Sequence, residues 1–435
     1  MKSMKRSVRF IVLFAIILII QSVLLSCDSK IKDTATENNY LWVGASSTSI
    51  NPEIGMFIAG DKPNRRFTGI HDSIFAKVVV VRKEKEILTL VTIDCIGLLY
   101  PDVQKIREKT CEIINDTLLT PERIIVASNH IHSGPDVVGI WGLSQLESGV
   151  DSVYMKRMIE ATANEVKKAF DLIKPAKVFS ASGEFGEEWV SNICEPEEID
   201  RELGTIQFTN TNGENIATLT NFACHPTFYD AVQDEVSADY VGAFYSDLSK
   251  SISGEHLFFQ GAIGGWVQPL KEDQSFEVGK KRGDELSAEV QRLLKQKKEL
   301  SSNDIAFRNE VFDLPITNPG WAQLSAAGVI KRDISSTTTT EMAWFRIGEA
   351  QFITHPGETP PAYSFASKKL MSDGPKFVIG LGLDAMGYIL KPEYFEPNTD
   401  LPHAEYLTRM SPGSEAGPLV LEKIEKLISE SNQQL

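Results

Sequence analysis

Apolar residues recur along the chain with two spacings, every second position in some segments and every third or fourth in others. Short runs with the first spacing, rich in β-branched and aromatic residues, indicate strands, and the second spacing indicates amphipathic helices. Strands are predicted at residues 76–81, 87–93, 123–127, 176–181, 204–208, 216–222, 256–260, 342–347, 350–354 and 376–381. Helices are predicted at residues 101–115, 150–173, 238–252, 277–298, 360–371 and 417–430.

Strands that alternate with helices in this way predict an α/β fold with mixed β-sheets flanked by helices. Residues 301–330 follow neither spacing and are expected to form a less regular connection. We expect one large domain over residues 41–435, because no repeat or low-complexity segment divides the chain.

A histidine pair follows the predicted strand at 123–127, in the sequence Asn-His130-Ile-His132-Ser-Gly-Pro. Side chains two residues apart on an extended segment point the same way, so both imidazoles face one side. Imidazole is the commonest metal ligand, and α/β proteins usually bind ligands at the carboxyl ends of strands. The pair therefore predicts a metal or catalytic site, with a hydrogen-bonded pair of core histidines as the alternative.

Two further predicted strands end in a similar motif. One leads into His225 and a proline, and the other leads into His355-Pro-Gly-Glu358. With His130, these strand ends predict a convergent set of two histidines and a carboxylate. Such a set suits a divalent metal with an open coordination position, zinc most readily. The alternative is that polar residues at strand ends only cap the turns.

The remaining histidines have weaker settings. His71 lies in Thr-Gly-Ile-His-Asp, directly before the first predicted strand. His256 and His403 lie in no comparable motif, and we expect both to be exposed and without a role.

Composition limits the class of partner. The hydrophobic content of 42% and charged content of 24% are ordinary for a globular protein. The formal net charge of −15 argues against nucleic acid or an anionic membrane surface as the main partner. We expect a small-molecule or lipid substrate.

The N-terminus has the pattern of a secretory signal, with basic residues up to Arg9 and an apolar segment at 10–25. It ends in Leu-Leu-Ser-Cys27, which resembles a bacterial lipobox, whose cysteine is lipidated after cleavage. We predict a signal peptide at 1–26, a lipidated tether at 27–40 and attachment to the bacterial cell envelope, periplasmic or on the outer surface. The alternative is an uncleaved anchor, for which about 16 apolar residues is short.

Four other cysteines could form disulfides in an exported protein. Their spacing shows no paired pattern, and we expect buried free thiols. Cys224 precedes His225, but neighbouring strand residues point to opposite faces, which argues against a nucleophile there. The four are Cys95, Cys111, Cys194 and Cys224.

A glycine-rich loop containing Gly264, Gly265 and Trp266 follows the predicted strand at 256–260. Glycines let backbone amides approach a ligand closely. A phosphate-binding loop would need Lys and Ser or Thr after the glycines, and this loop lacks them. An oxyanion or metal-site loop and a plain tight turn both fit the sequence.

Five short motifs, in order, resemble the catalytic region of the neutral/alkaline non-lysosomal ceramidases, and the resemblance extends from about Val43 to the end. Those enzymes are zinc amidases that cut the N-acyl bond of ceramide to give sphingosine and a fatty acid. Their α/β catalytic domain is followed by an immunoglobulin-like domain, which we do not expect here. The motifs are Gly-Ile-His71-Asp, Asn-His130-Ile-His132-Ser-Gly-Pro, Asn-Phe-Ala-Cys-His225-Pro, Pro-Gly-Glu358 and Gly-Leu-Asp-Ala-Met-Gly-Tyr388.

The resemblance implies roles for individual residues. His132 would help to bind the reacting group, and Tyr406 would be a further tyrosine of the substrate site. His71 and Asp94 would lie near the site without an assigned role. The implied zinc ligands are His130, His225, Glu358 and Tyr388.

Two positions depart from the family pattern. The family has a serine nucleophile in a Gly-Asp/Asn-x-Ser-Pro-Asn segment, whereas residues 264–269 read Gly-Gly-Trp-Val-Gln-Pro. Ile193 stands where the family has an arginine. Zinc-activated water needs no serine, because the metal lowers the pKa of water to about 7.

We therefore predict a metal-dependent hydrolase that cuts an N-acyl amide or ester bond with metal-activated water. His132 or Glu358 would move protons, and the amides of Gly264 and Gly265 would stabilise the oxyanion. The alternative is a non-catalytic surface lipoprotein that binds a lipid or glycan on the same fold.

Two tryptophans are predicted to contact the substrate, Trp141 in the loop after the His-x-His motif and Trp266 in the glycine loop. Aromatic faces stack on sugars as readily as they line acyl grooves, so they leave lipid and glycan open. Both could instead pack loops against the core. Without the family's serine, we expect a smaller N-acyl or O-acyl compound to be a better substrate than long-chain ceramide.

Overall fold

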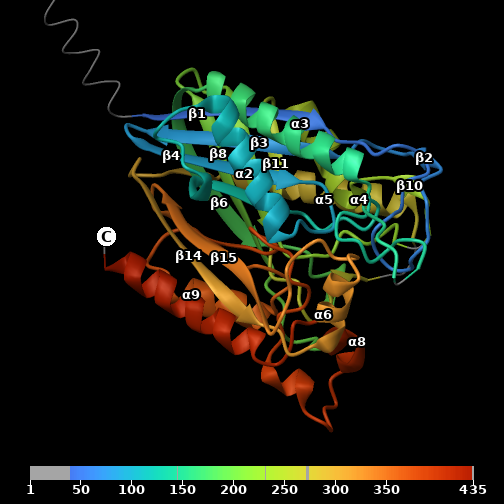
Figure 1. Ribbon diagram of the computed structural model, residues 1–435. Helices are drawn as coiled ribbons and strands as arrows, with labels where there is room; N and C mark the ends of the chain where they lie inside the picture. Colours follow the sequence, from blue (N-terminus) through green and yellow to red (C-terminus); the bar gives the residue numbers. More distant parts are fainter. Residues whose placement is uncertain (1–39, 145, 231, 271–273, 434–435) are drawn as a thin grey trace, which may run out of the picture.

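The computed structural model describes residues 40–144, 146–230, 232–270 and 274–433 (Figure 1). The predicted signal peptide, Cys27 and nearly all of the predicted tether lie outside the described residues. Within these ranges, no helix combines the length and the apolar character that crossing a membrane requires.

A nine-stranded mixed sheet forms the larger part of the core. Its strands lie in the order β11-β9-β8-β6-β1-β3-β4-β5, with β13 added on β6. The pairs β4–β5 and β9–β11 are parallel, and the sheet curls until β11 contacts β3, β4 and β5. The strands are β1 (Leu41–Ser49), β3 (Phe75–Lys83), β4 (Glu86–Ile93), β5 (Ile124–Ser128), β6 (Lys174–Glu184), β8 (Glu202–Asn210), β9 (Asn215–Phe222), β11 (Glu255–Gln260) and β13 (Lys298–Glu299).

A four-stranded sheet packs against the large one, in the order β14 (Ile305–Pro315), β15 (Thr337–Ile347), β16 (Ala350–Thr354) and β17 (Lys376–Ile379). Within the four-stranded sheet, the ring of Phe352 stacks between those of Phe345 and Phe377, at distances of 4.7 and 4.5 Å. These rings share one apolar core with Leu219 and Phe259 of the large sheet. Two short ribbons pair β2 (Gly69–Ile70) with β10 (Glu235–Val236) and β7 (Val190–Asn192) with β12 (Val267–Pro269).

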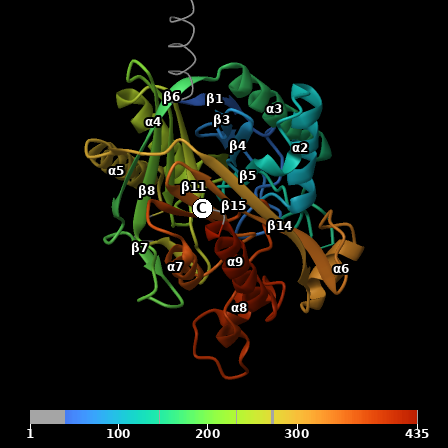
Figure 2. The same ribbon diagram turned by 90° about the vertical axis from the view of Figure 1, so that its left-hand side faces the viewer.

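Helices cover both sheets. On the large sheet, α3 lies on β1 and β3 with α2 beside it, while α4 and α5 pack together (Figure 1). On the four-stranded sheet, α7 and α9 lie side by side (Figure 2). The helices are α2 (Tyr100–Ile114), α3 (Ser152–Asp171), α4 (Asp239–Ser251), α5 (Phe276–Leu294), α6 (Pro319–Ala326), α7 (Pro361–Leu370), α8 (Ala404–Arg409) and α9 (Ala416–Asn432), with 3-10 turns at Pro121–Arg123 and Pro392–Phe395.

Helix α3 shows how the sequence places a helix on the sheet. The Asp151 carboxylate accepts the backbone N–H groups of Val153 and Tyr154 and so caps its first turn. Near its other end the helix approaches the backbone of β1 at Gly44. A Cβ at Gly44 would lie 2.1 Å from the Ala169 carbonyl oxygen, so only glycine allows this contact.

The predicted fold class is confirmed, and each predicted strand and helix overlaps an observed one. Two expectations are wrong. Residues 301–330 contain β14, which sequence patterning missed because its side chains are mostly half-buried and do not alternate. His256 is buried on β11, where its Nε2 bonds the Ile252 carbonyl oxygen at 2.9 Å and burial lowers its pKa to about 4.

The carboxyl ends of strands from both sheets meet at one edge. The amide of Ser128, the last residue of β5, donates to the Leu381 carbonyl oxygen at 3.2 Å, and the Gly380 amide donates to the Gln260 carbonyl oxygen at 2.9 Å. The Asn221 side chain of β9 donates to Val378 at 3.0 Å. These bonds fix the loops after β5, β9, β11 and β17 relative to one another, and the predicted site residues lie on or beside these loops.

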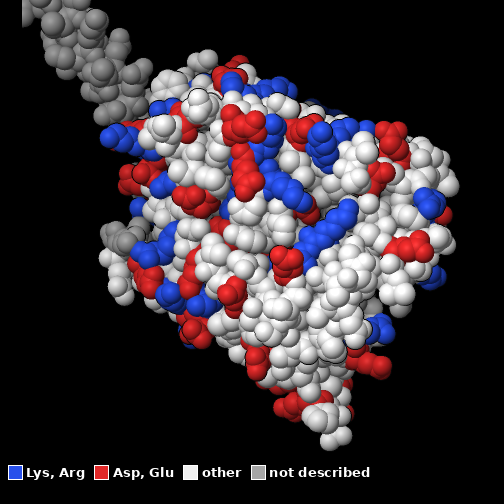
Figure 3. Space-filling view, in the orientation of Figure 1, with Lys and Arg blue, Asp and Glu red and all other residues white. Residues whose placement is uncertain are grey.

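Surface charge is mixed on the face shown in Figure 3, where Lys and Arg are interspersed with Asp and Glu. Such a distribution gives this face no strong field of a single sign.

Candidate metal centre

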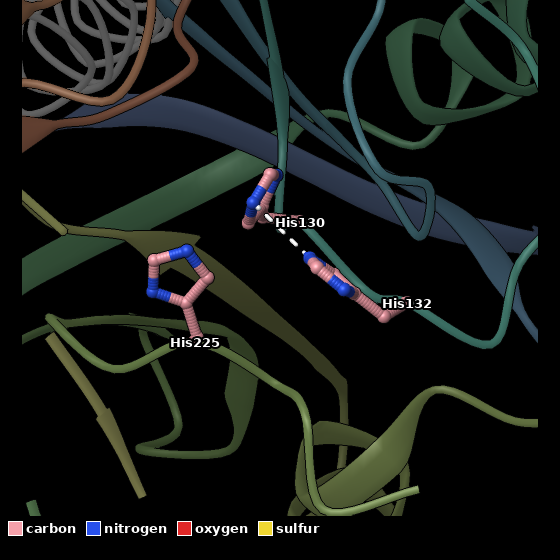
Figure 4. Close-up of side chains that lie close together, drawn as sticks. All are labelled: His130, His132 and His225. Carbon is pink, nitrogen blue, oxygen red and sulfur yellow. Dashed lines mark hydrogen bonds between the residues drawn. The ribbon is translucent and has the colours of Figure 1, made fainter. Parts of the chain in front are cut away.

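Three histidines meet where the predicted strands end (Figure 4). His130 and His132 follow β5 and His225 follows β9, and one nitrogen of each lies within 4.8 Å of the others. The Nε2 atoms of His130 and His132 are 3.3 Å apart, and the ring of His130 lies 4.9 Å from those of both His132 and His225. The structure thus brings together histidines that are up to 95 residues apart in sequence, His130 and His225.

Glu358 completes this cluster. Its Oε2 lies 3.1 Å from His225 Nε2 and 3.6 Å from His130 Nε2. Its backbone is held by the segment that carries Tyr388, because the Glu358 amide donates to Gly387 and the Ile389 amide donates to Glu358. Burial raises the pKa of the carboxyl group, but the neighbouring histidines outweigh it, and the net pKa is lowered. Glu358 therefore stays ionised.

The outer ring nitrogens of two histidines are committed to backbone carbonyls. His130 Nδ1 lies 2.5 Å from the Ile96 oxygen and His225 Nδ1 lies 2.7 Å from the Val267 oxygen. A carbonyl oxygen only accepts, so each Nδ1 carries the hydrogen and each Nε2 presents its lone pair to the cluster. Burial is the main cause that lowers the pKa of His130, to about 3, so this ring is neutral.

His130 occupies the left-handed region of backbone conformation, at φ +69°. For a residue with a side chain this costs free energy, of order 1–3 kcal/mol, so the surroundings must impose it. The His130 amide donates to Cys95 at 3.0 Å and the Asn129 amide to Ile93 at 3.2 Å. The Asn129 side chain donates to Asp94.

Asp94 thus lies behind the histidines, as the resemblance implied, and it also accepts the Phe75 amide at 2.8 Å. Its side chain is fully buried, and burial raises its pKa to about 7. Its contacts position the loop that carries His130.

Gln260 was not recognised as a site residue from the sequence, yet its side chain joins the two histidine-bearing loops. Its Nε2 donates to the Asn129 carbonyl at 3.2 Å and to the Cys224 carbonyl at 2.9 Å. Its Oε1 accepts the Cys224 amide at 3.0 Å. The signal available in the sequence was a polar residue at the end of the apolar run of β11.

Aromatic side chains border the cluster on one side. Trp266 Nε1 donates to the Tyr388 hydroxyl at 2.6 Å. The Trp266 ring lies 5.3 Å from Tyr406 and 4.7 Å from His403, and Tyr406 lies 6.4 Å from Tyr388. Tyr406 is 37% exposed, so this group reaches the surface.

The charges of nearby carboxylates act on Tyr406. The pKa of Tyr406 is raised to about 12 by burial and by the charges of Glu358, Asp230 and Asp61. Tyr406 therefore lies within electrostatic reach of all three carboxylates. The surface-reaching part of the site thus combines aromatic rings with nearby negative charge.

Two residues predicted to bind substrate have other contacts. Trp141 is half-buried and packs against the main core, and its amide donates to Asp136 at 2.9 Å. Trp141 therefore packs its loop against the core, which was the alternative to a substrate contact. The ring of His71 stacks on Phe276 at 3.6 Å and meets Tyr229 edge to face at 6.3 Å.

The glycine loop differs from expectation at one position. The Gly264 amide donates to the Thr359 carbonyl oxygen at 2.8 Å, so it is not available to stabilise an oxyanion. A Cβ at Gly264 would lie 2.5 Å from the Glu358 carbonyl oxygen. Gly264 instead lets the loop pack against the segment that carries Glu358. An oxyanion role in this loop remains a prediction for Gly265 alone.

The two departures from the family pattern lie next to each other in space, because the Ile193 amide donates to the Trp266 carbonyl oxygen at 3.2 Å. Val267 is fully buried, and its carbonyl oxygen also accepts the His225 amide at 3.0 Å. Cys224 is buried, and burial raises the pKa of its thiol well above the usual value, which rules against a thiolate nucleophile. The cysteines of the described residues are free, as expected.

His355 takes no part in the cluster. Its Nδ1 lies 2.6 Å from the Thr359 hydroxyl and its Nε2 lies 3.1 Å from the Ser367 hydroxyl. It is fully buried, and burial lowers its pKa to about 3. This histidine stabilises the turn that presents Glu358.

No known family model matches the chain. Over 153 residues it is 24% identical to neutral ceramidase A of Dictyostelium discoideum, a segment that spans 30% of this chain and 20% of that protein. The crystal structure of neutral ceramidase from Pseudomonas aeruginosa matches 90% of this chain and 75% of its own, with a TM-score of 0.74 and 16% identity. The chain has the neutral-ceramidase fold.

A second solved structure, a ceramidase complexed with C2, has a TM-score of 0.72 and 15% identity over 91% of this chain and 76% of its own. The resemblance seen in the five motifs is thus confirmed, with strong divergence in sequence. At 16% and 15% identity these matches establish the fold alone.

Proposed function

We propose that the protein is a zinc-dependent hydrolase of an N-acyl amide or a related ester bond. The observation that carries the proposal is the set of inward-facing donors: imidazole lone pairs and an ionised carboxylate point at one another, with their hydrogens directed outward. Glu358 Oε2 lies 3.1 Å from His225 Nε2 and 3.6 Å from His130 Nε2. Donors bound tetrahedrally to zinc at about 2.0–2.1 Å are separated by about 3.3 Å, so the set fits this ion.

The residues that would hold zinc are His130, His225 and Glu358, with Tyr388 as the fourth ligand that the resemblance implies. Bound zinc would polarise a substrate carbonyl and make hydroxide available at neutral pH. The Glu358 carboxylate, which lies beside the histidines, can accept and return a proton. The hydroxyl of Tyr406 can donate to the substrate where the site reaches the surface.

Water rather than a side chain is the proposed nucleophile. The segment where the family has its serine contributes Val267, which is buried, and Cys224 is a buried thiol. The neutral ceramidases that the chain resembles support an N-acyl substrate. The surface-reaching part of the site supports a compound without a negative charge, because Glu358, Asp230 and Asp61 all lie near Tyr406.

The experiment is a screen of N-acyl amides and esters with zinc-loaded protein, with and without a chelator. We expect chelator-sensitive hydrolysis that is lost in His130→Ala. Zinc bound at one equivalent without any turnover would favour the second candidate, a lipid- or glycan-binding lipoprotein. The observation that favours that candidate is Val267, which stands where the ceramidase family has its serine nucleophile.

We also propose that Cys27 anchors the protein to the bacterial cell envelope, on the strength of the lipobox-like sequence before it. Labelling of cells with a fatty-acid analogue should mark the wild-type protein and not Cys27→Ser. Equal labelling of both would contradict the anchor.

A further inference from the structure

We propose that Trp266, His403 and Tyr406 form a subsite for the ring of a sugar, and that the substrate is therefore an acylated sugar. This inference rests on the proposed function and deepens it, because it names the part of the substrate that the metal cluster does not hold. The evidence is that three rings from two distant segments meet beside Tyr388, with charged groups around them.

The three rings form one group next to the cluster. Trp266 comes from the glycine loop, whereas His403 directly precedes α8 and Tyr406 lies within it. The His403 and Tyr406 rings lie 4.7 and 5.3 Å from the Trp266 ring and are tilted to it by 50° and 40°, so neither covers it face to face. Trp266 Nε1 donates to the Tyr388 hydroxyl at 2.6 Å, so the group is one hydrogen bond away from a proposed metal ligand.

Two of the three rings are presented from strained backbone. Trp266 and His403 lie in the left-handed region, at φ +64° and +59°. Such a conformation costs of order 1–3 kcal/mol, so the surroundings must impose it, and it is commonest at functional sites. The Ile193 amide donates to the Trp266 carbonyl oxygen at 3.2 Å, and the thiol of the next residue, Cys194, donates to the Pro402 carbonyl oxygen at 3.0 Å. One turn thus holds both ring-bearing segments.

A small apolar cluster supports the rings from one side. Trp266 is half-buried against it, while His403 and Tyr406 are exposed. The rings are therefore fixed to the fold and still reach solvent. The cluster consists of Cys194, Tyr388, Leu390, Tyr394, Ala404 and Leu407.

The charges around Tyr406 favour a sugar over an acyl chain. The carboxylates of Asp230 and Asp61 act on Tyr406, and the Arg409 guanidinium lies 5.6 Å from its ring. An acyl chain against these rings would take the charges out of water without giving them partners, which costs free energy. The hydroxyl groups of a sugar can donate to carboxylates and accept from a guanidinium, while its C–H face packs on an aromatic ring.

Hydrolysis of an acylated sugar would break the bond between the carbonyl carbon and the sugar nitrogen or oxygen. Water gives its hydroxyl to that carbon and its remaining proton to the sugar nitrogen or oxygen. The products are an acid and a free amino sugar or sugar hydroxyl. The sugar thus takes the place that sphingosine has as the leaving group in ceramide.

The first test compares kcat/KM of the zinc-loaded protein for three compounds with one acyl group: N-acetylglucosamine, N-acetylgalactosamine and N-acetylethanolamine. The third lacks the ring. We expect at least one sugar to be cleaved about 10-fold or more better, because a site that bonds the substrate's hydroxyl groups rejects a compound without them. Equal or better cleavage of N-acetylethanolamine, or of short-chain ceramide, would overturn the inference.

The second test removes an exposed ring. His403→Ala should raise KM for the sugar about 3- to 10-fold with little change in kcat, the pattern of a lost ground-state contact. KM for N-acetylethanolamine should stay the same. The matched control is Phe365→Ala, which removes an aromatic side chain of α7 that is 44% exposed and should change neither value. An equal effect of His403→Ala on both substrates, or none on the sugar, would overturn the subsite.

Trp266 needs a pair of variants, because it also bonds Tyr388. Trp266→Phe keeps a ring without this bond, and Trp266→Leu loses both. At equal zinc content, Trp266→Leu should have the higher KM for the sugar, and equal KM values of the two variants would overturn the subsite.

Calorimetric titration with both sugars separates the subsite from the proposed hydrolase. Binding of a sugar, weakened in His403→Ala, without any turnover would refute the hydrolase and support the subsite. Turnover of N-acetylethanolamine by a protein that binds neither sugar would overturn the subsite and leave the hydrolase intact.

Discussion

The side chain of Gln260 bonds to both backbone groups of Cys224, accepting its amide at 3.0 Å and donating to its carbonyl at 2.9 Å. Since Cys224 precedes His225 and Gln260 also bonds Asn129, one side chain sets the spacing of two histidine loops. Gln260→Ala should weaken zinc binding about 10-fold or more, as other supports of metal ligands do. It should also destabilise the fold by about 1–3 kcal/mol, because buried backbone groups lose their partner.

Zinc titration and thermal unfolding check this prediction. Gln260→Glu is a matched control of the same size, which keeps an acceptor for the Cys224 amide but loses the donor. An affinity of Gln260→Ala equal to that of the wild type would contradict the bridging role.

Metal content should depend on histidines from both strands. His130→Ala and His225→Ala should each abolish tight zinc binding, because each removes an inward-facing lone pair and His225 also contacts Glu358. Elemental analysis after dialysis measures the effect. His256→Ala is a suitable comparison, since this buried histidine bonds the Ile252 carbonyl oxygen at the start of β11 and should affect stability without changing the zinc content of folded protein. A full equivalent of zinc in the double variant of His130 and His225 would end the proposed site.

Hydrolysis should proceed in one displacement, without an acyl-enzyme, because the segment of the family's serine carries Val267 and Gln268. The first product should form without a pre-steady-state burst, because no acyl-enzyme accumulates. In ¹⁸O-labelled water one labelled oxygen should enter the acid product, and an added amine should capture no acyl group. A covalent acyl adduct isolated by mass spectrometry would refute direct attack by water.

The substrate should be smaller than long-chain ceramide and should carry no negative charge. Short N-acyl or O-acyl compounds should be cleaved faster, and an anionic head group should slow cleavage because of Asp230 and Asp61. Comparison of kcat/KM across acyl length and head-group charge checks both parts. Efficient cleavage of long-chain ceramide, lost in His130→Ala, would restore the full ceramidase activity and show that this expectation is wrong.

The Asp384 carboxylate should be essential for stability. It pairs with the Arg332 guanidinium through two bonds of 2.7 and 2.8 Å, and it accepts the Tyr100 amide at 2.9 Å and the Thr340 hydroxyl at 2.7 Å. All of this is buried, so Asp384→Ala leaves an unpaired buried cation and should cost about 3–5 kcal/mol. Denaturant unfolding measures it. Asp284→Ala, in an exposed helical pair with Lys280, should cost only about 0.3–0.5 kcal/mol.

The periodic parts of the fold were predictable because burial on sheets and helices leaves a regular trace in the sequence. β14 was missed because its side chains are mostly half-buried, and His256 was judged exposed because a lone histidine gives no sign of its burial. The donors of the cluster were predictable because each follows a strand. Gln260 was not, because its role depends on a neighbour 131 residues away in the sequence.

The Val267 carbonyl oxygen holds His225 through two hydrogen bonds, whereas its side chain makes neither of them. The backbone at this position therefore serves the metal cluster whatever side chain is present. A fold built in this way can exchange a reactive side chain for an inert one, and back again, without dismantling the cluster beside it. The metal cluster and the covalent nucleophile are therefore independent features of this fold, and the single substitution Val267→Ser would combine them.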